Sequence, residues 1–445
     1  MLTINDILKN TDSKLLNGNV NTIVEDIIIN STQVKNNSCF FGIKGNNTDG
    51  SLYYKEALEK GANVLVLSKE YEYNFKGYED RVVIITKDTT KVLQDLAKYK
   101  RSLFKGPVIA ITGSVGKTST KEMIASVLSQ NYKVLKTEGN NNSQLGLPLT
   151  ILRQKDEEVM VLEMGMSDLN HIHNLSLIAK PDIAVITNIG NSHIKYLKTK
   201  ENILKAKLEI IDGMNNDKTL IINNDDIYLK DINPDINIIT IGINNKSNIM
   251  ASNIKENIKT TFSISDIDNL KVNGPKNLIY NALFAYTVGK RLGLSRSMIK
   301  KGINETNNIK HRLELIKLNN NIVLIDDTYN ASYESIKLAI NYLSKYSNRK
   351  ILVLGDILEL GKETKRIHKK VAELIKSSNI DVLITIGKHS KIIGKLNKDI
   401  WLKHFRKEEK AREYIKSNIK ENDVILLKGS NGMNLVNIVK FLKDE

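Results

Sequence analysis

The sequence predicts an α/β protein of three domains. These are a small N-terminal α/β domain, a central domain with a phosphate-binding loop (P-loop) and a doubly wound, mostly parallel sheet, and a C-terminal Rossmann-like α/β domain. The chain has 445 residues, enough for about three domains of roughly 150 residues each. Apolar runs of strand length alternate with helical segments, and several end in polar residues, as strands of parallel sheets do where ligands bind. A glycine-rich stretch at residues 110–120 joins a predicted strand to a predicted helix.

The composition is that of a folded globular protein, with 41% hydrophobic and 26% charged residues. The net charge of +16 raises the possibility of nucleic-acid binding. The lysines, however, are spread along the whole chain, and aromatic residues make up only 6%. We therefore expect no nucleic-acid partner. A basic surface also suits anionic small substrates such as nucleotides.

Localisation follows from three features of the sequence. No apolar run is long enough to span a bilayer. The first residues lack a signal-peptide pattern. Cys39 is the only cysteine, so no intrachain disulfide can form. We expect a cytoplasmic protein without a membrane span.

Helical periodicity and strand-like apolar runs place domain boundaries at residues 1–88, 89–312 and 313–445. A first helix is expected over 4–9, where Thr3 is the N-cap and Asp6 completes a capping box. The other predicted helices cover 53–60, 89–104, 199–211, 277–292 and 335–343. Predicted strands cover 23–29, 39–43, 62–67, 82–85, 108–111, 133–135, 159–163, 183–186, 219–222, 322–325, 351–354, 382–386 and 424–427.

The glycine-rich stretch at residues 110–120 predicts a phosphate site. Gly113 and Gly116 bracket a tight loop, and Lys117 and Thr118 follow at the start of a helix. Backbone N–H groups and the helix dipole favour phosphate there, Lys117 adds a positive charge, and the Thr118 hydroxyl can ligate Mg2+. An ordinary glycine turn is the weaker interpretation, because Gly-Lys-Thr at a strand-to-helix junction is typical of a phosphate site.

Polar side chains at three predicted strand ends are candidates for the same crevice, namely Glu163, Asn188 and Asp225. Glu163 suits a metal, because a hard cation prefers carboxylate oxygen. For Asp225 an ordinary loop role is favoured. His193 lies in the loop after Asn188, and a lone histidine is more often structural than functional.

The order of the motifs resembles the Mur ligase family of ATP-dependent amide-forming enzymes over nearly the whole chain. The motifs that carry the resemblance are residues 112–118, 137–142, 161–165, 187–190 with Ser192-His193, and 206–210 after Glu201. Two later stretches, residues 326–332 and 353–361, are similar to the members that add D-alanyl-D-alanine to UDP-N-acetylmuramoyl-tripeptide. The resemblance thus implies an ATP-dependent ligase of peptidoglycan precursor synthesis that acts through an acyl phosphate. It also implies a monomer.

The resemblance further implies roles for individual residues. The implied catalytic residues are Lys117, His193 and Lys207. Two Mg2+ ions are implied, held by Thr118, Glu163, His193 and Lys207, with Lys207 carbamylated by CO2 so that it offers carboxylate-like oxygen. ATP would contact Gly113, Ser114, Val115, Gly116, Lys117, Thr118 and Ser119, and then Asn277, Asn281, Arg312, Asp327, Tyr329 and Asn330. The UDP-sugar peptide would contact Ser31, Asp49, Gly50, Asn140 and Asn142.

Four departures from the family pattern leave alternatives open. This chain has Asn30-Ser31-Thr32 for Asp-Ser-Arg, Ser51 for His, Lys276 for His and Asn431 for Arg. A paralogue with a different acceptor or amino substrate is the first alternative, because function is set by the site and not by the fold. A non-catalytic protein that binds nucleotides or nucleic acid is the second. Whether the third peptide residue is lysine or diaminopimelate also stays open.

Overall fold

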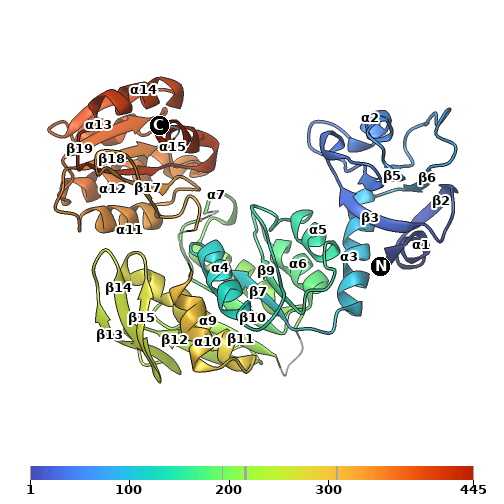
Figure 1. Ribbon diagram of the computed structural model, residues 1–445, viewed down its shortest axis with the longest axis horizontal. Coiled ribbons are helices and arrows are strands. Elements are labelled where there is room, and N and C mark those ends of the chain that lie inside the picture. Colours follow the sequence, from blue (N-terminus) through green and yellow to red (C-terminus); the bar gives the residue numbers. More distant parts are fainter. Residues whose placement is uncertain (1, 193, 215–217, 307–308, 444–445) are drawn as a thin grey trace.

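The computed structural model describes residues 2–192, 194–214, 218–306 and 309–443. Within them, three sheets follow one another along the chain, with six, nine and six strands. Figure 1 shows the N-terminal and C-terminal domains standing on the same side of the central domain, far from each other. The predicted three-domain α/β architecture is confirmed. The exact boundaries stay predictions, since helix α3 (Thr89–Leu103) packs with side chains of the first two sheets.

The first sheet has the order β1-β3-β4-β5-β6-β2, with parallel pairing from β3 to β6 and antiparallel edge strands. The predicted capping box is present, because the Thr3 hydroxyl accepts from the Asp6 N–H and Asp6 accepts from the Thr3 N–H. The edge strands were not predicted, since one has two residues and the other lacks regular alternation. The elements are β1 (Leu2–Thr3), α1 (Ile4–Asn10), β2 (Ser13–Asn17), β3 (Ile23–Ile28), β4 (Ser38–Phe41), α2 (Tyr54–Glu59), β5 (Val64–Ser68) and β6 (Val82–Thr86).

The central sheet has the order β15-β14-β13-β12-β11-β10-β7-β9-β8. It is parallel from β8 through β13, and β14 and β15 add antiparallel pairs at one edge. The strands are β7 (Val108–Thr112), β8 (Val134–Lys136), β9 (Val159–Glu163), β10 (Ile183–Ile186), β11 (Thr219–Asn223), β12 (Asn237–Gly242), β13 (Ile249–Lys255), β14 (Thr260–Ile264) and β15 (Ile267–Val272). Register pairs Ile111 with Glu163 and Thr112 with Ile186, so three loops meet at one sheet edge.

Helices cover both faces of the central sheet, as expected for a doubly wound domain. One core joins the sheet to α4 (Lys117–Leu128), α9 (Ile279–Arg291) and α10 (Arg296–Asn304). The opposite core joins it to α5 (Gly146–Leu152), α6 (His171–Ala179), α8 (Lys200–Leu208) and the end of α3. A short helix, α7 (Ile194–Leu197), precedes α8.

The C-terminal sheet has the order β16-β17-β21-β18-β19-β20 and is parallel except for β16. Helices α11 to α13 pack on one face, and α14 and α15 on the other. The elements are β16 (Glu314–Lys317), β17 (Val323–Asp327), α11 (Tyr333–Leu343), β18 (Lys350–Gly355), α12 (Thr364–Lys376), β19 (Val382–Ile386), α13 (Lys391–Leu396), β20 (Trp401–Phe405), α14 (Glu408–Asn418), β21 (Val424–Lys428) and α15 (Val436–Lys443).

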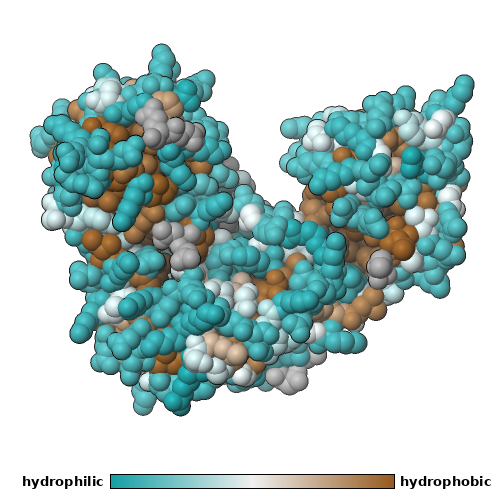
Figure 2. Space-filling view, in the orientation of Figure 1, coloured by the Kyte–Doolittle hydropathy of each residue, from teal (hydrophilic) through white to brown (hydrophobic). Residues whose placement is uncertain are grey.

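The outer domains contact the central domain differently. The N-terminal domain is attached through α3, where the Tyr99 hydroxyl donates to Asp6 at 3.0 Å. The C-terminal domain docks at several points, among them Tyr342, whose hydroxyl donates to the Ile258 carbonyl at 3.2 Å. Figure 2 shows open space between the two outer domains above the central one. Among the described residues, no helix combines the length and apolarity needed to cross a membrane.

Candidate active site

The phosphate loop lies between β7 and α4 and has the backbone that its glycines predict. Gly113 has φ +150°, and a Cβ there would lie 1.8 Å from the Thr187 hydroxyl oxygen. Gly116 has φ +87° and forms the N-cap of α4. Asn188 fixes the loop tip, because its side chain accepts from the Val115 N–H at 3.0 Å and donates to the Val115 carbonyl at 2.8 Å. The loop is therefore held in shape by the neighbouring strand end.

Thr118 and Glu163 meet at the rim of this loop. The Thr118 hydroxyl donates to Glu163 Oε2 at 2.9 Å, and Asn142 donates to Glu163 Oε1 at the same distance. Thr137 supports this carboxylate by accepting from the Glu163 N–H at 2.9 Å. Glu163 is only 2% exposed. A buried carboxylate and a hydroxyl facing a phosphate loop form a set of hard oxygen donors that fits Mg2+.

Two lysines gather beside the loop. Lys117 is the first residue of α4, and its ammonium donates to the Gly113 carbonyl at 2.9 Å. Burial lowers the pKa of Lys117, while the Glu163 charge opposes this shift. Lys207 on α8 is 1% exposed, and burial together with the Lys117 charge holds the pKa of its amine well below its usual range. A depressed pKa favours the neutral amine.

Arg312 reaches the loop from the connection between the central and C-terminal domains. It donates from Nη2 to the Thr118 hydroxyl at 3.0 Å, and its guanidinium lies 3.9 Å from the centroid of the Tyr329 ring. Its neighbours His311 and Leu313 have φ of +63° and +51°, a left-handed backbone that is uncommon for such residues. His311 is fixed by Asp326, with 2.6 Å between Nδ1 and Oδ2. The left-handed backbone on both sides of Arg312 and the contact between His311 and Asp326 thus hold Arg312 in position.

Asp327 and Asn330 follow β17, on the C-terminal side of the site. Asp327 pairs with Lys428 at the end of β21, where Nζ lies 2.6 Å from Oδ2. Lys428 also donates to the Asn330 carbonyl at 2.9 Å. Burial raises the pKa of Asp327 and lowers that of Lys428, while each charge stabilises the other. The ring of Tyr329 extends from the same loop, and its hydroxyl donates to Asn140 of the central domain.

Of the predicted adenosine residues of the central domain, Asn277 lies in the short turn before α9 and Asn281 in the first turn of that helix. Asn281 accepts from the Thr120 hydroxyl at 3.0 Å, which places it against α4. Asn277 Oδ1 is buried and has no hydrogen-bond partner among the described residues. A cavity of about 600 Å3 lies beside these residues and is lined in part by Thr118 and Arg312. Its volume is typical of ligand pockets.

The structure does not bring the N-terminal candidates to the phosphate loop. Ser31, Asp49 and Gly50 lie in the N-terminal domain, which stands apart on the right in Figure 1. The Asp49 carboxylate accepts from the Ser51 N–H at 2.9 Å and from the Tyr71 hydroxyl at 3.4 Å. Ser51, which replaces the family's histidine, is fully buried and donates to the Gly42 carbonyl at 3.0 Å.

The remaining predicted residues have these places. The Ser114 hydroxyl accepts a hydrogen bond from the Gly190 N–H at 2.7 Å, and Ser119 is buried on α4. Asp225 accepts from the backbone of residues 243–245 and from the Tyr280 hydroxyl, so the favoured loop role is confirmed. His193 lies outside the described residues.

Sequence reasoning missed several residues that shape the site, namely Lys121, Glu122, Thr137, Glu334 and Lys428. Lys121 is buried on α4 and donates to the Thr137 carbonyl at 2.5 Å. Lys428 could have been found, because it is a charged residue that directly follows the apolar run of the last parallel strand. Glu334 gave no such signal, since its contact with Asn191 joins two domains.

Taken together, the site offers a phosphate cradle, a buried carboxylate–hydroxyl pair and several cations on facing domains. Lys117 lies close enough to Glu163, Arg312 and Lys207 for their charges to interact, and Arg312 also contacts Thr118. Such an excess of positive charge favours a polyanionic ligand. The arrangement can hold a nucleotide triphosphate with a divalent cation and stabilise negative charge that develops during phosphoryl transfer.

Comparison with known families agrees with this chemistry. Models described as Mur ligase middle domain, Mur ligase glutamate ligase domain, and Mur ligase family catalytic domain match residues 111–289, 311–431 and 24–101. The chain is 35% identical to the UDP-N-acetylmuramoyl-tripeptide--D-alanyl-D-alanine ligase of Bacillus subtilis, over 95% of this chain and 93% of the relative.

Solved structures of full-length relatives have the same architecture. The structure of MurF from Acinetobacter baumannii superposes with a TM-score of 0.87 at 25% identity, covering 100% of this chain and 99% of that one. The MurF ligase from Thermotoga maritima in complex with ADP gives a TM-score of 0.83 at 27% identity, covering 95% and 98%. The similarity therefore extends over all three domains.

Proposed function

Because the chain belongs to the Mur ligase family, we propose that it is an ATP-dependent ligase joining D-alanyl-D-alanine to UDP-N-acetylmuramoyl-tripeptide. The observation that carries the proposal is the phosphate loop with Thr118 and buried Glu163 in contact at its rim. The Bacillus subtilis relative has this activity in its name, and the Thermotoga maritima neighbour was solved with ADP. The product would be a precursor of peptidoglycan.

The proposed reaction has two steps, and its atoms balance as follows. The terminal carboxylate of the tripeptide attacks the γ-phosphorus of ATP, and the bond from that phosphorus to ADP breaks. The amine of D-alanyl-D-alanine then attacks the acyl carbon, the bond from carbon to phosphate oxygen breaks, and the amine releases a proton. The protein contributes positioning and charge neutralisation. Lys117 and the N–H groups of the loop would hold the β- and γ-phosphates.

Thr118 and Glu163 are the residues that would hold one Mg2+. Their oxygens are already in contact with each other at 2.9 Å, and carboxylate and hydroxyl oxygens suit this ion. When bound, Mg2+ neutralises phosphate charge during transfer. The position of His193, which the family resemblance assigns to a second Mg2+, lies outside the described residues.

Carbamylation of Lys207 is supported by its environment. CO2 adds to a neutral amine, giving a carbamate anion and releasing a proton. Burial and the nearby Lys117 charge favour the neutral form of Lys207. The carbamate would offer oxygen to a cation and offset the charge of Lys117.

The nucleoside of ATP would lie between Asn277 and the C-terminal domain. The buried, unpartnered Oδ1 of Asn277 is an acceptor available to a base amine. Tyr329 presents a ring face that already holds Arg312. The N-terminal domain would hold the UDP-sugar peptide through Ser31, Asp49 and Gly50. We also propose that the enzyme acts in the cytoplasm, where ATP is supplied, and as a monomer.

Phosphate release measured with purified protein, ATP and Mg2+ tests the proposal. We expect release to require both UDP-N-acetylmuramoyl-tripeptide and D-alanyl-D-alanine. A small panel of tripeptides ending in lysine or diaminopimelate would identify the acceptor. Turnover only with other peptide pairs would indicate a paralogue with changed substrates. Salt-sensitive nucleic-acid binding without turnover would contradict the enzymatic proposal.

A further inference from the structure

We propose that Glu334 binds the ammonium group of the incoming amino substrate. This inference rests on the proposed ligase function and assigns a residue to its second step. Glu334 lies in the first turn of α11, in the C-terminal domain. Its carboxylate crosses the domain boundary and contacts the loop that follows β10 in the central domain. The side chain therefore lies beside the phosphate loop although it belongs to another domain.

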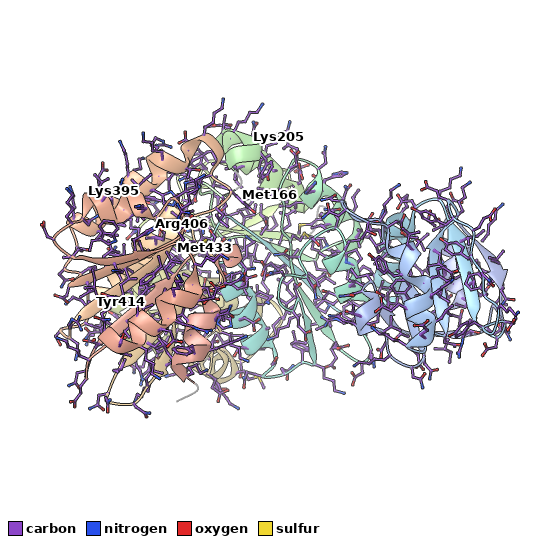
Figure 3. The ribbon with its side chains drawn as sticks, turned by 90° about the horizontal axis from the view of Figure 1, so that it is seen from above. Met166, Lys205, Lys395, Arg406, Tyr414 and Met433 are labelled. Atoms are coloured by element: carbon purple, nitrogen blue, oxygen red, sulfur yellow. The ribbon has the colours of Figure 1, made fainter. Side chains whose placement is uncertain are left out.

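One hydrogen bond and the close approach of Gly190 place this carboxylate. Asn191 donates from Nδ2 to Glu334 Oε1. A Cβ built on Gly190 would lie 3.8 Å from the Glu334 carboxyl carbon and 3.1 Å from Ser114 Cβ. Since Ser114 belongs to the phosphate loop, Glu334 lies at the lip of that loop. In the view from above, Figure 3 shows the C-terminal domain, marked by Arg406 and Met433, overlying the central domain and far from the N-terminal domain.

The second carboxylate oxygen of Glu334, Oε2, lacks a partner within the described residues, which favours a role in binding a ligand. Oε2 is buried and has no hydrogen-bond partner among the described residues. It is not used to cap its helix, because Ser332 and Ser335 form the capping box of α11. A buried carboxylate oxygen without a donor or cation costs free energy, so a bound cationic donor would remove that cost.

The chemistry of the substrates selects an ammonium. ATP is anionic and the UDP-sugar tripeptide has a net negative charge, whereas the amino substrate brings its positively charged group to the bond that is formed. Its amine must also approach the acyl phosphate formed beside the loop.

The variant Glu334→Gln tests the assignment, because it keeps the shape and the acceptor but removes the charge. We expect the KM for D-alanyl-D-alanine to rise by about 10- to 100-fold, the range for losing a hydrogen bond to a charged group. The KM values for ATP and the UDP-sugar tripeptide should stay within about threefold, since those substrates do not use this charge. Glu334→Asp should restore part of the affinity.

A neutral nucleophile separates a binding role from a structural one. Hydroxylamine is uncharged at neutral pH and traps an acyl phosphate as a hydroxamate. Glu334→Gln should form hydroxamate from ATP and the tripeptide at the wild-type rate, which also shows that the variant is folded. Glu373→Gln, an exposed change on α12, is the matched control and should leave every constant unchanged.

The outcomes are distinguishable. An unchanged KM for the dipeptide in Glu334→Gln would overturn the assignment, and so would an equal loss of hydroxamate formation. A raised Mg2+ requirement with an unchanged KM for the dipeptide would identify Glu334 as a metal ligand instead. If wild-type protein released no phosphate with these substrates, the proposed function itself would fail.

Discussion

In the Lys428→Met variant, the C-terminal domain should unfold at a much lower urea concentration than in the wild-type protein. Lys428 is 1% exposed, and its ammonium pairs with Asp327 at 2.6 Å and donates to the Asn330 carbonyl at 2.9 Å. The substitution leaves the buried Asp327 carboxylate without its ion-pair partner, while the Leu313 N–H and the Arg312 charge still stabilise it. Breaking one partner of such a pair costs about 3–5 kcal/mol. At roughly 2 kcal/mol per molar urea, the unfolding midpoint should fall by about 2 M.

The chain provides its own probe for this measurement. Trp401, the only tryptophan, lies on β20 of the C-terminal sheet and donates to the Thr385 hydroxyl at 3.1 Å. Its fluorescence therefore reports unfolding of this domain. The double variant Asp327→Asn with Lys428→Met removes both charges and should recover much of the loss, since neutral replacement of a buried pair is often tolerated.

The pH dependence of the Lys428→Met effect has a definite sign. Burial already raises the pKa of Asp327, and the Lys428 charge opposes that shift. Without Lys428 the pKa of Asp327 rises further, so the folded variant binds a proton more readily than the unfolded chain. The destabilisation should therefore be smaller at pH 5 than at pH 8. Lys370→Met, an exposed change on α12, should cost less than about 0.5 kcal/mol. An equally small effect for Lys428→Met would refute the reasoning.

Three further predictions concern the site and the C-terminal core. Lys207→Ala should lower ligase turnover by roughly 10²-fold or more, because a positioned charge is lost. Wild-type turnover of that variant at saturating Mg2+ and low CO2 would contradict it. Glu163→Gln should raise the Mg2+ concentration for half-maximal phosphate release about tenfold or more, and an unchanged value would exclude Glu163 as a ligand. Burial lowers the pKa of His368, whose neutral ring accepts from the Ile357 N–H. The urea midpoint should thus fall as pH drops below about 6.5, and His368→Gln should flatten this dependence.

The phosphate loop could be predicted because its requirements are local. Gly113 and Gly116 adopt positive φ, and no side chain fits at Gly113 beside Thr187. The proximity of Glu163 to the loop was also predictable. Parallel strands of a sheet end at a common edge, and the register pairs Ile111 with Glu163.

The strands β12 to β15 could not be assigned from sequence. Residues 237–272 are rich in Asn, Asp and Lys, and the strands alternate poorly, since β12 and β13 are partly exposed over much of their length whereas β14 is mostly buried. The antiparallel pairs β13–β14 and β14–β15 contain register shifts near Ser252 and Phe262. Such irregular pairing is set by packing against α9 and α10, which a local pattern does not encode.

Contacts between domains were likewise beyond sequence reasoning. Arg312 and Thr118 are 194 residues apart, and Asn191 and Glu334 are 143 apart. These contacts depend on how one folded domain docks on another. The family resemblance named Arg312 as a nucleotide residue, but neither it nor the spacing indicated contact with Thr118. Sequence reasoning therefore gave the parts of each domain and not their assembly.

The charges at the phosphate loop offer an explanation for part of the net charge of +16 that does not require nucleic-acid binding. Lys428 is paired with Asp327, and Lys117 interacts with Glu163, but Lys207 is buried next to the positive charge of Lys117. Burial lowers the pKa of both lysines, and the Lys117 charge lowers that of Lys207 further, so holding these amines in the charged form costs the folded chain free energy. An anionic ligand at the loop lowers that cost for Lys117 and favours its charged form. The electrostatics of the loop region therefore favours polyphosphate over neutral ligands.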